Sequence, residues 1–188
     1  MKAIIAIAGG SAGGKTTFAR KLQSLLESYR VCMLHTDTYF RPTSERPSVQ
    51  SHLNDTFYVD DNCPDAIDFD RYHADFDAAC ASDCEVIITE GLWVLWDTYI
   101  RDRINLRVYV DCRSDERIVR RLRRNMGWGL TFDQIADFYL DMVRFRHEQY
   151  IEPTKWTADL IINGTGNTDI ACRMCADQIE KLCAREDV

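Results

Sequence analysis

Residues 2–17 read KAIIAIAGGSAGGKTT, and this stretch decides the fold. The apolar run from Lys2 to Ala8 predicts a buried strand that ends in a tight glycine turn. The pattern G-x-x-x-x-G-K-[ST] follows, met by Gly9, Gly14, Lys15 and Thr16. A helical spacing of apolar residues begins at Lys15. A strand, this pattern and a helix in this order predict a phosphate-binding loop, whereas a mere glycine-rich turn with an ordinary lysine would not explain all three.

Each residue type in this loop suits the binding of phosphate. Glycines let the backbone turn tightly, the backbone N–H groups of residues 10–17 can point at an anion, and the helix N-terminus adds partial positive charge. The Lys15 ammonium can reach the β- and γ-phosphates, and the Thr16 hydroxyl can bind Mg²⁺. We therefore expect ATP and Mg²⁺ as cofactors, bound by Gly9, Gly10, Ser11, Ala12, Gly13, Gly14, Lys15, Thr16 and Thr17.

The rest of the chain alternates between strands and helices. Further strands are expected at 30–36, 85–89, 106–111 and 159–162, and helices at 65–81, 114–125, 131–150 and after Thr168. Residues 39–62 show no clear period and are expected to form a long loop, in which a helical turn could occur. The alternation predicts an α/β fold of the P-loop type, a three-layer sandwich with a mainly parallel five-stranded sheet flanked by helices. We expect one domain over residues 1–188, with a lid at about 125–131.

Composition limits the classes of protein and partner. With 188 residues, of which 46% are hydrophobic, the chain suits one globular domain. The net charge of -7 argues against nucleic acid as a partner, because phosphate neutralisation needs clustered Lys and Arg. No signal peptide or membrane span is evident, so a cytoplasmic protein without membrane partners is expected, and a homo-oligomer stays open. The eight cysteines, Cys172 and Cys175 among them, are expected to be free thiols rather than zinc ligands.

Two acids follow predicted strands. Asp37 comes after the strand at 30–36, and ligands of open α/β sheets bind at the carboxyl ends of strands. Its carboxylate could accept a proton from an attacking hydroxyl, or it could cap the following turn, and the local pattern does not separate these interpretations. Glu90 follows the strand at 85–89, where an acid can hold Mg²⁺ directly or through water. We favour this metal role over that of a turn carboxylate.

Five arginines crowd the helix at 114–125. Arg117, Arg121 and Arg124 share one face, because they are spaced i, i+4, i+7. Arginine suits the stabilisation of charge on a transferring phosphoryl group. The alternative is a solvated basic face that pairs with nearby acids. Five arginines in an acidic protein favour a functional role for at least two of them.

With these residues in place, the chain resembles the uridine kinase and phosphoribulokinase group of P-loop kinases, and uridine kinases most. The matching stretches are GGSAGGKTT (9–17), DTYF (37–40), PDAID (64–68), ITEGL (88–92), VDCRSDERIVRRLRR (110–124) and HEQYIEPTKWTADLII (147–162). The resemblance implies transfer of the ATP γ-phosphate to a hydroxyl. Asp37 matches the family's catalytic base, and Arg121 and Arg124 match arginines that contact the phosphates. Together with Lys15 they form the predicted catalytic set.

The chain also departs from the uridine kinase pattern. Uridine kinases carry a base-contacting β-hairpin between the PDAFD-like stretch and the strand ending in EG, and residues 69–89 leave no room for it here. Asn62 stands in place of a substrate-binding Asp. The lid reads NMGWGL at 125–130, without its usual arginine pair. The resemblance also places the adenine site partly against the arginine helix and residues 163–167.

We therefore expect a kinase of a nucleoside or related ribose-containing metabolite. The predicted substrate-binding residues are Asp37, Phe40, Tyr58, Asn62 and Arg144. Aromatic residues near the cleft could stack on a base or belong to the core, namely Tyr39, Phe40, Tyr58 and Trp93. Two alternatives stay open. One is a kinase of a non-pyrimidine acceptor, such as nicotinamide riboside, a sugar phosphate or a pantothenate-like alcohol. The other is a nucleotide-binding regulatory protein without kinase activity.

Overall fold

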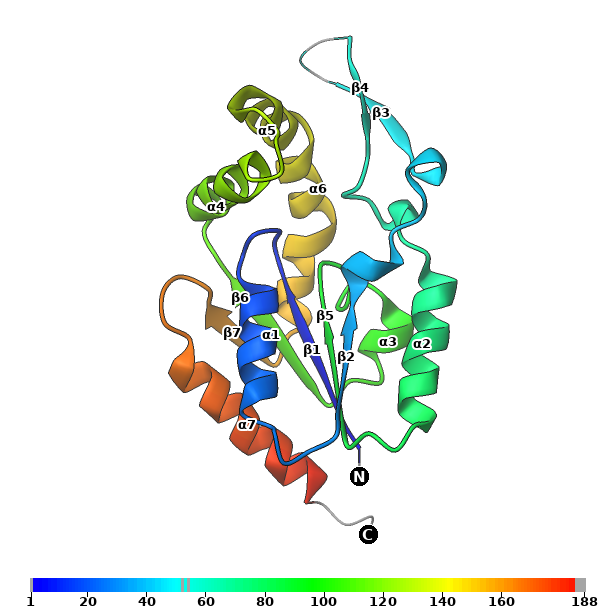
Figure 1. Ribbon diagram of the computed structural model, residues 1–188, viewed down its shortest axis with the longest axis vertical. Coiled ribbons are helices and arrows are strands. Elements are labelled where there is room, and N and C mark those ends of the chain that lie inside the picture. Colours follow the sequence, from blue (N-terminus) through cyan, green and yellow to red (C-terminus); the bar gives the residue numbers. More distant parts are fainter. Residues whose placement is uncertain (1, 52, 54, 185–188) are drawn as a thin grey trace.

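A parallel sheet of five strands forms the centre of the protein (Figure 1). The computed structural model describes residues 2–51, 53 and 55–184. The strand order is β2–β5–β1–β6–β7. The strands are β1 (Ala3–Gly9), β2 (Val31–His35), β5 (Val86–Glu90), β6 (Leu106–Asp111) and β7 (Leu160–Asn163). The predicted α/β fold is confirmed, because all five expected strands are present and pair in parallel.

The register of the sheet brings the strand ends together. In the register of β1 with β5, Ile7 lies opposite Glu90, and Glu90 in turn lies opposite His35 of β2. On the other side of β1, Gly9 lies opposite Val110 of β6. Since all strands run in one direction, the loops that follow β1, β2 and β5 leave the sheet at the same edge.

One face of the sheet is covered by α1 (Lys15–Ser24) and α7 (Asp169–Cys183) (Figure 1). Cys172 and Cys175 are fully buried there as free thiols, as expected. Ile170 and Met174 of α7 are exposed. The cysteines take the inward positions because a thiol packs as a small apolar side chain.

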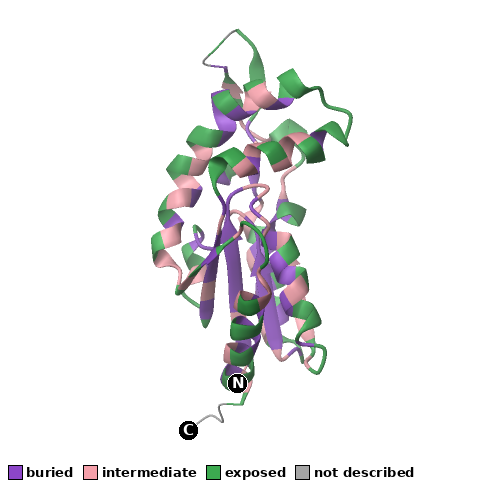
Figure 2. Ribbon diagram, turned by 90° about the vertical axis from the view of Figure 1, so that its left-hand side faces the viewer, coloured by how far each residue is buried: buried purple, intermediate pink, exposed green. Residues whose placement is uncertain are grey.

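The other face is covered by α2 (Phe69–Ala81) and α3 (Thr98–Arg101). Tyr39 and Trp93 are buried in this layer, so these two aromatic residues belong to the core rather than to the cleft. Figure 2 shows buried strands in the middle of the sheet, and β1, β5 and β6 are the strands buried along most of their length. The sheet is therefore a rigid platform for the loops at its edge.

A second helical group stands above the carboxyl edge of the sheet (Figure 1). It begins with α4 (Ser114–Met126) and continues with α5 (Phe132–Phe138), whose first turn is closed by a capping box of Thr131 and Gln134. The helix then runs on without a break through two π turns. These are Tyr139–Val143 and His147–Ile151, separated by α6 (Arg144–Arg146). Each π turn rotates the following residues relative to a regular α-helix.

The segment 39–62 differs from the predicted loop. Its strands β3 (Ser48–Gln50) and β4 (Phe57–Val59) pair antiparallel and project away from the main sheet (Figure 1). A strand of three residues is too short to show the alternation of apolar and polar residues by which a strand is recognised in a sequence. Residues 69–89 hold only α2, a turn and most of β5, so the predicted absence of a hairpin there is confirmed.

Short 3₁₀ turns complete the chain at Thr36–Tyr39, Thr43–Glu45, Pro64–Ala66 and Glu152–Thr157. Within the described part of the chain, no helix has both the length and the apolar character needed to cross a membrane. The single domain over 1–188, the cytoplasmic location and the oligomeric state stay predictions.

Candidate active site

The phosphate loop joins β1 to α1 at the centre of the carboxyl edge. Its first glycine, Gly9, has φ of 144°, and a side chain there would collide with the Val110 carbonyl oxygen of β6. Gly14 caps α1 with φ of 99°. Residues 11–18 line a cavity of about 560 Å³, which is large enough for a nucleotide. The sequence pattern and the observed loop therefore agree.

Lys15 is the buried cation of this loop. Its ammonium donates to the Gly10 carbonyl oxygen at 3.0 Å. Burial lowers the pKa of Lys15, although the nearby carboxylates of Glu90 and Asp37 act in the opposite direction. A buried ammonium held among few partners gains most from an anion placed in the same cavity.

Glu90, Thr16 and His35 form a hydrogen-bonded cluster at the ends of three elements. The Thr16 hydroxyl donates to Glu90 Oε1 at 2.8 Å, and His35 Nδ1 lies 2.8 Å from the same oxygen. Because the hydroxyl hydrogen is directed to Glu90, the lone pairs of the Thr16 oxygen are free for a cation. A hydroxyl and a carboxylate are oxygen ligands that suit Mg²⁺.

No group of three or more His, Cys, Asp or Glu suited to a metal occurs among residues 2–51, 53 and 55–184. Proteins usually hold Mg²⁺ through one or two side chains together with phosphates of the substrate. His35 was missed in the sequence. Its only signal was its position at the end of a strand, next to Asp37.

Asp37 lies where two cavities meet. It is exposed at the start of the turn after β2 and lines the nucleotide cavity. It also lines a second cavity, of about 550 Å³, which extends toward β4 and α5. Ser11, Leu92 and Arg124 are likewise shared by both cavities. A group bound in the first cavity can therefore reach a group bound in the second beside the Asp37 carboxylate.

The second cavity has aromatic walls. Three of the predicted substrate-binding residues, Phe40, Tyr58 and Asn62, line it, and Trp128 and Phe138 add two rings for which no role was predicted. The rings of Tyr58 and Phe138 lie 5.0 Å apart and tilted by 55°. Flat apolar walls of this kind suit an aromatic ring system in the ligand.

Arg144 does not line this cavity. It is exposed on α6, with its guanidinium 4.6 Å from the Phe145 ring centroid. Two residues further on, Arg146 turns inward and donates to the buried Asp60 carboxylate at 2.7 and 2.8 Å. Arg144 therefore lies outside the cavity for which it was predicted, and the inward position is taken by Arg146.

Two arginines of α4 reach the junction of the cavities. Arg121 lines the second cavity and donates to the Ser11 hydroxyl of the phosphate loop at 3.1 Å. Burial, with Arg124 as a second cause, lowers the pKa of Arg121 to about 10. Burial also lowers the pKa of Arg124, although the nearby Asp37 carboxylate acts in the opposite direction. Two crowded, partly desolvated guanidinium groups favour the approach of phosphate.

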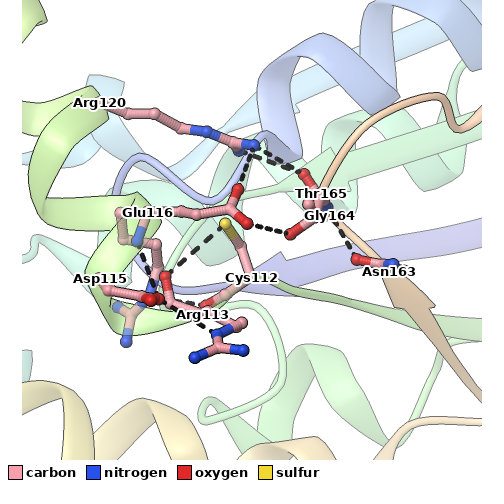
Figure 3. A network of polar contacts seen from close by, with 9 residues as sticks. Cys112, Arg113, Asp115, Glu116, Arg120, Asn163, Gly164 and Thr165 are labelled. Carbon is pink, nitrogen blue, oxygen red and sulfur yellow. Dashed lines mark hydrogen bonds and ion pairs between the residues drawn. The ribbon is translucent and has the colours of Figure 1, made fainter.

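Arg117 and Arg120 of this helix have structural partners. Arg117 is buried and donates to the Cys112 carbonyl oxygen at 3.0 Å. Figure 3 shows Arg120 donating to the Gly164 carbonyl oxygen at 3.2 Å and to Glu116 at 3.1 Å. Glu116 in turn accepts from the Thr165 hydroxyl at 3.0 Å.

This network ties α4 to residues 163–167 beside the nucleotide cavity, which Arg120, Gly164 and Gly166 line. The alternative of a basic face paired with acids thus applies to Arg120. It does not apply to Arg121, whose side chain turns toward the phosphate loop.

Comparison with known proteins agrees with this geometry. A model of the phosphoribulokinase / uridine kinase family matches residues 65–171. The uridine kinase of Staphylococcus epidermidis is 31% identical over 97% of this chain and 98% of its own length. The uridine kinase of Chloroflexus aggregans is 31% identical over 94% of each chain.

Solved structures share the fold at lower identity. A structure described as a possible uridine kinase from Bacillus stearothermophilus has a TM-score of 0.60 at 19% identity, covering 86% of this chain and 89% of its own. A Thermus thermophilus protein has a TM-score of 0.56 at 16% identity, covering 95% and 97%. From the matched residues and the near-complete coverage by its relatives, this chain belongs to the phosphoribulokinase / uridine kinase family.

Proposed function

We propose that this kinase transfers the γ-phosphoryl group of Mg-ATP to a hydroxyl of a nucleoside or related ribose-containing metabolite. The observation that carries the proposal is the position of Asp37, which lines both the nucleotide cavity and the aromatic cavity. A carboxylate at that junction serves transfer between two ligands, whereas a protein that only binds a nucleotide has no use for it.

Each residue at the junction has one role in the proposed transfer. Asp37 orients the acceptor hydroxyl and takes its proton as the oxygen attacks phosphorus. Lys15, Arg121 and Arg124 stabilise the negative charge on the transferring group. Thr16 and Glu90 would hold Mg²⁺, which neutralises charge on the phosphates when bound. Residues 9–17 bind the phosphates of ATP through their backbone.

The aromatic cavity supports a nucleoside-like acceptor. Its walls include Phe40, Tyr58, Trp128 and Phe138, between which a flat base could stack, while Asn62 supplies a polar group. The relatives named uridine kinase favour the same class of acceptor.

A non-pyrimidine acceptor, such as nicotinamide riboside, is a second candidate. It is favoured by residues 69–89, which form α2 and β5 without the hairpin expected of uridine kinases. Here the hairpin of β3 and β4 contributes Tyr58 to the wall from a different part of the chain. The two candidates share the transfer chemistry and differ in the acceptor molecule that is bound.

A panel of acceptors tests both candidates. ADP formation from Mg-ATP is measured with uridine, cytidine, nicotinamide riboside, sugar phosphates and pantothenate-like alcohols, and the phosphorylated product is identified by mass spectrometry. Uridine or cytidine turnover would exclude the second candidate. Tight ATP binding without turnover of any acceptor would instead favour a regulatory protein.

Asp37→Asn tests the mechanism. We expect turnover to fall about 10²- to 10⁴-fold while the dissociation constant for ATP stays within about twofold, because the base acts only in the chemical step. Asp65→Asn, at an exposed position outside both cavities, is the matched control and should behave like the wild type. Near-normal turnover of Asp37→Asn would contradict the assigned role.

A further inference from the structure

The second, aromatic cavity is called the acceptor cavity from here on. A third, small cavity lies between it and the phosphate loop. It measures about 10 Å³ and is lined by Ser11, Asn62, Arg117, Arg146 and His147, together with three apolar side chains. Ser11 and Asn62 also line the acceptor cavity. A space of roughly 10–15 Å³ with several polar walls holds a single water molecule.

Two polar atoms at this cavity are buried without a protein partner. Asn62 Nδ2 and His147 Nδ1 make no hydrogen bond to any described residue. Asn62 is 8% exposed as a residue, and the His147 side chain is 11% exposed. Buried polar groups are almost always hydrogen-bonded, because leaving them unpaired is costly, so both atoms require a partner that the protein itself does not supply.

The hydrogen bonds of His147 fix what kind of partner is needed. Its Nε2 lies 3.1 Å from Glu152 Oε2, and since a carboxylate only accepts, Nε2 carries the hydrogen. Burial and the positive charge of Arg117 lower the pKa of His147 to about 4, against the opposing effect of Glu152. The ring is therefore neutral near pH 7, and its Nδ1 is an acceptor. Asn62 Nδ2 can only donate.

We propose that one buried water molecule accepts a hydrogen bond from Asn62 Nδ2 and donates one to His147 Nδ1. Water is the one small molecule that serves a donor and an acceptor at once in this volume. The Ser11 hydroxyl, which already accepts from Arg121, supplies a further polar wall. His147 then acts as a positioning residue, because it orients the Asn62 amide at the wall of the acceptor cavity.

The link also connects the acceptor side to the helix that follows α6. His147 lies in the second π turn, and Asn62 lies in the segment between β4 and α2. A bridge between them holds these two parts of the chain at one distance, so that Asn62 meets the acceptor in a single orientation. The effect on acceptor binding rests on the proposed function, whereas the water bridge itself does not.

Three substitutions at position 147 separate the two nitrogens of the ring. The Oδ1 atom of asparagine takes the place of Nδ1, so His147→Asn keeps an acceptor for the water and loses the contact with Glu152. His147→Gln reaches Glu152 but loses the acceptor, and His147→Phe loses both. We expect the acceptor KM to rise roughly tenfold in the Gln and Phe variants and to stay within about twofold in the Asn variant. The KM for ATP should stay within about twofold in all three.

A readout without turnover keeps the water bridge testable if no acceptor is found. Exchange of the Asn62 side-chain amide hydrogens with solvent, followed by NMR, should be slow in the wild type and the Asn variant and fast in the Gln and Phe variants. A crystal structure should show a water within hydrogen-bond distance of both atoms. Density without that water, or amide exchange as fast in the Asn variant as in the Gln variant, would overturn the proposal. A failed acceptor screen beside slow wild-type exchange would count against the proposed function alone.

Discussion

The two halves of the cleft are built differently. The donor half, which consists of the phosphate loop with Glu90 and His35, lies on the ends of strands whose register is fixed by the central sheet. The acceptor half, which consists of β3, β4, residues 125–131 and α5, lies on short segments outside that sheet (Figure 1). Trp128 is 68% exposed, and Tyr58 is held by a hairpin of two short strands.

This difference separates the chemistry of transfer from the choice of acceptor. Groups fixed by a packed sheet are preorganised for charge stabilisation, which depends on small distances. Rings carried on short exposed segments can adjust to the ligand they enclose. Changes in the donor half should therefore lower turnover with any acceptor. Changes in the acceptor half should alter affinity for one acceptor and leave the chemical step intact.

The largest effect is expected from Lys15→Ala in the donor half. Loss of the ammonium that we propose to bind the phosphates should lower kcat/KM about 10³-fold, with every acceptor that the wild type uses. Steady-state kinetics with two acceptors measures this. Lys21→Ala, which removes a cation from the same helix but outside both cavities, should change kcat/KM by less than about twofold. A loss of kcat/KM with only one of the two acceptors would contradict the proposed division of roles between the two halves.

A smaller effect is expected from Glu90→Gln. The amide keeps the size of the carboxylate but removes the negative charge of the group that accepts from Thr16 and that we propose to hold Mg²⁺. We expect kcat to fall about 10²-fold and the Mg²⁺ concentration for half-maximal activity to rise. Titration of activity with Mg²⁺ at saturating ATP measures both. An unchanged Mg²⁺ dependence would remove Glu90 from the metal site.

The donor half was also the part that the sequence could predict. Phosphate binding needs glycines, a lysine and a hydroxyl at fixed spacing, so the pattern at residues 9–17 carries its own geometry. The positions of Asp37 and Glu90 after predicted strands then put both acids at the same edge of the sheet, since the carboxyl ends of parallel strands lie at one edge. His35 escaped notice because a histidine at a strand end has no pattern until its hydrogen bond to Glu90 is seen.

The acceptor half could not be predicted to the same degree. The hairpin of β3 and β4 has strands too short to show alternation, and Trp128 lies in a turn that has no period. The π turns had no visible signal either, because they arise from packing rather than from a residue type. Asn62 was predicted from the resemblance to the family, and Tyr58 was predicted as an aromatic residue near the cleft.

The acceptor half should respond to Tyr58→Ala. Loss of a stacking wall should raise the acceptor KM about tenfold and leave kcat within about twofold, since a ring stacked on a base contributes on the order of 1–3 kcal/mol. Phe57→Ala is a matched control on the same strand, because Phe57 is exposed and does not line the cavity. Equal effects of the two substitutions would show that the hairpin matters only as a fold element.

The smallest effect on activity is expected from Arg144→Ala, because its side chain is exposed and outside both large cavities. The acceptor KM and the midpoint of thermal unfolding should both stay close to those of the wild type. Arg146→Ala is the informative contrast. It leaves the buried Asp60 carboxylate without its cation, and breaking such a pair costs about 3 kcal/mol of unfolding free energy.

Denaturant unfolding of the two variants, together with acceptor kinetics, distinguishes the two arginines. A raised acceptor KM in Arg144→Ala with unchanged stability would mean that the acceptor half closes far enough to bring this exposed arginine onto the ligand. In that case α6 would belong to the acceptor half. An unchanged acceptor KM in Arg144→Ala would mean that Arg144 does not contact the acceptor. Arg146, through its pair with Asp60, would then be the arginine that supports the structure of the site.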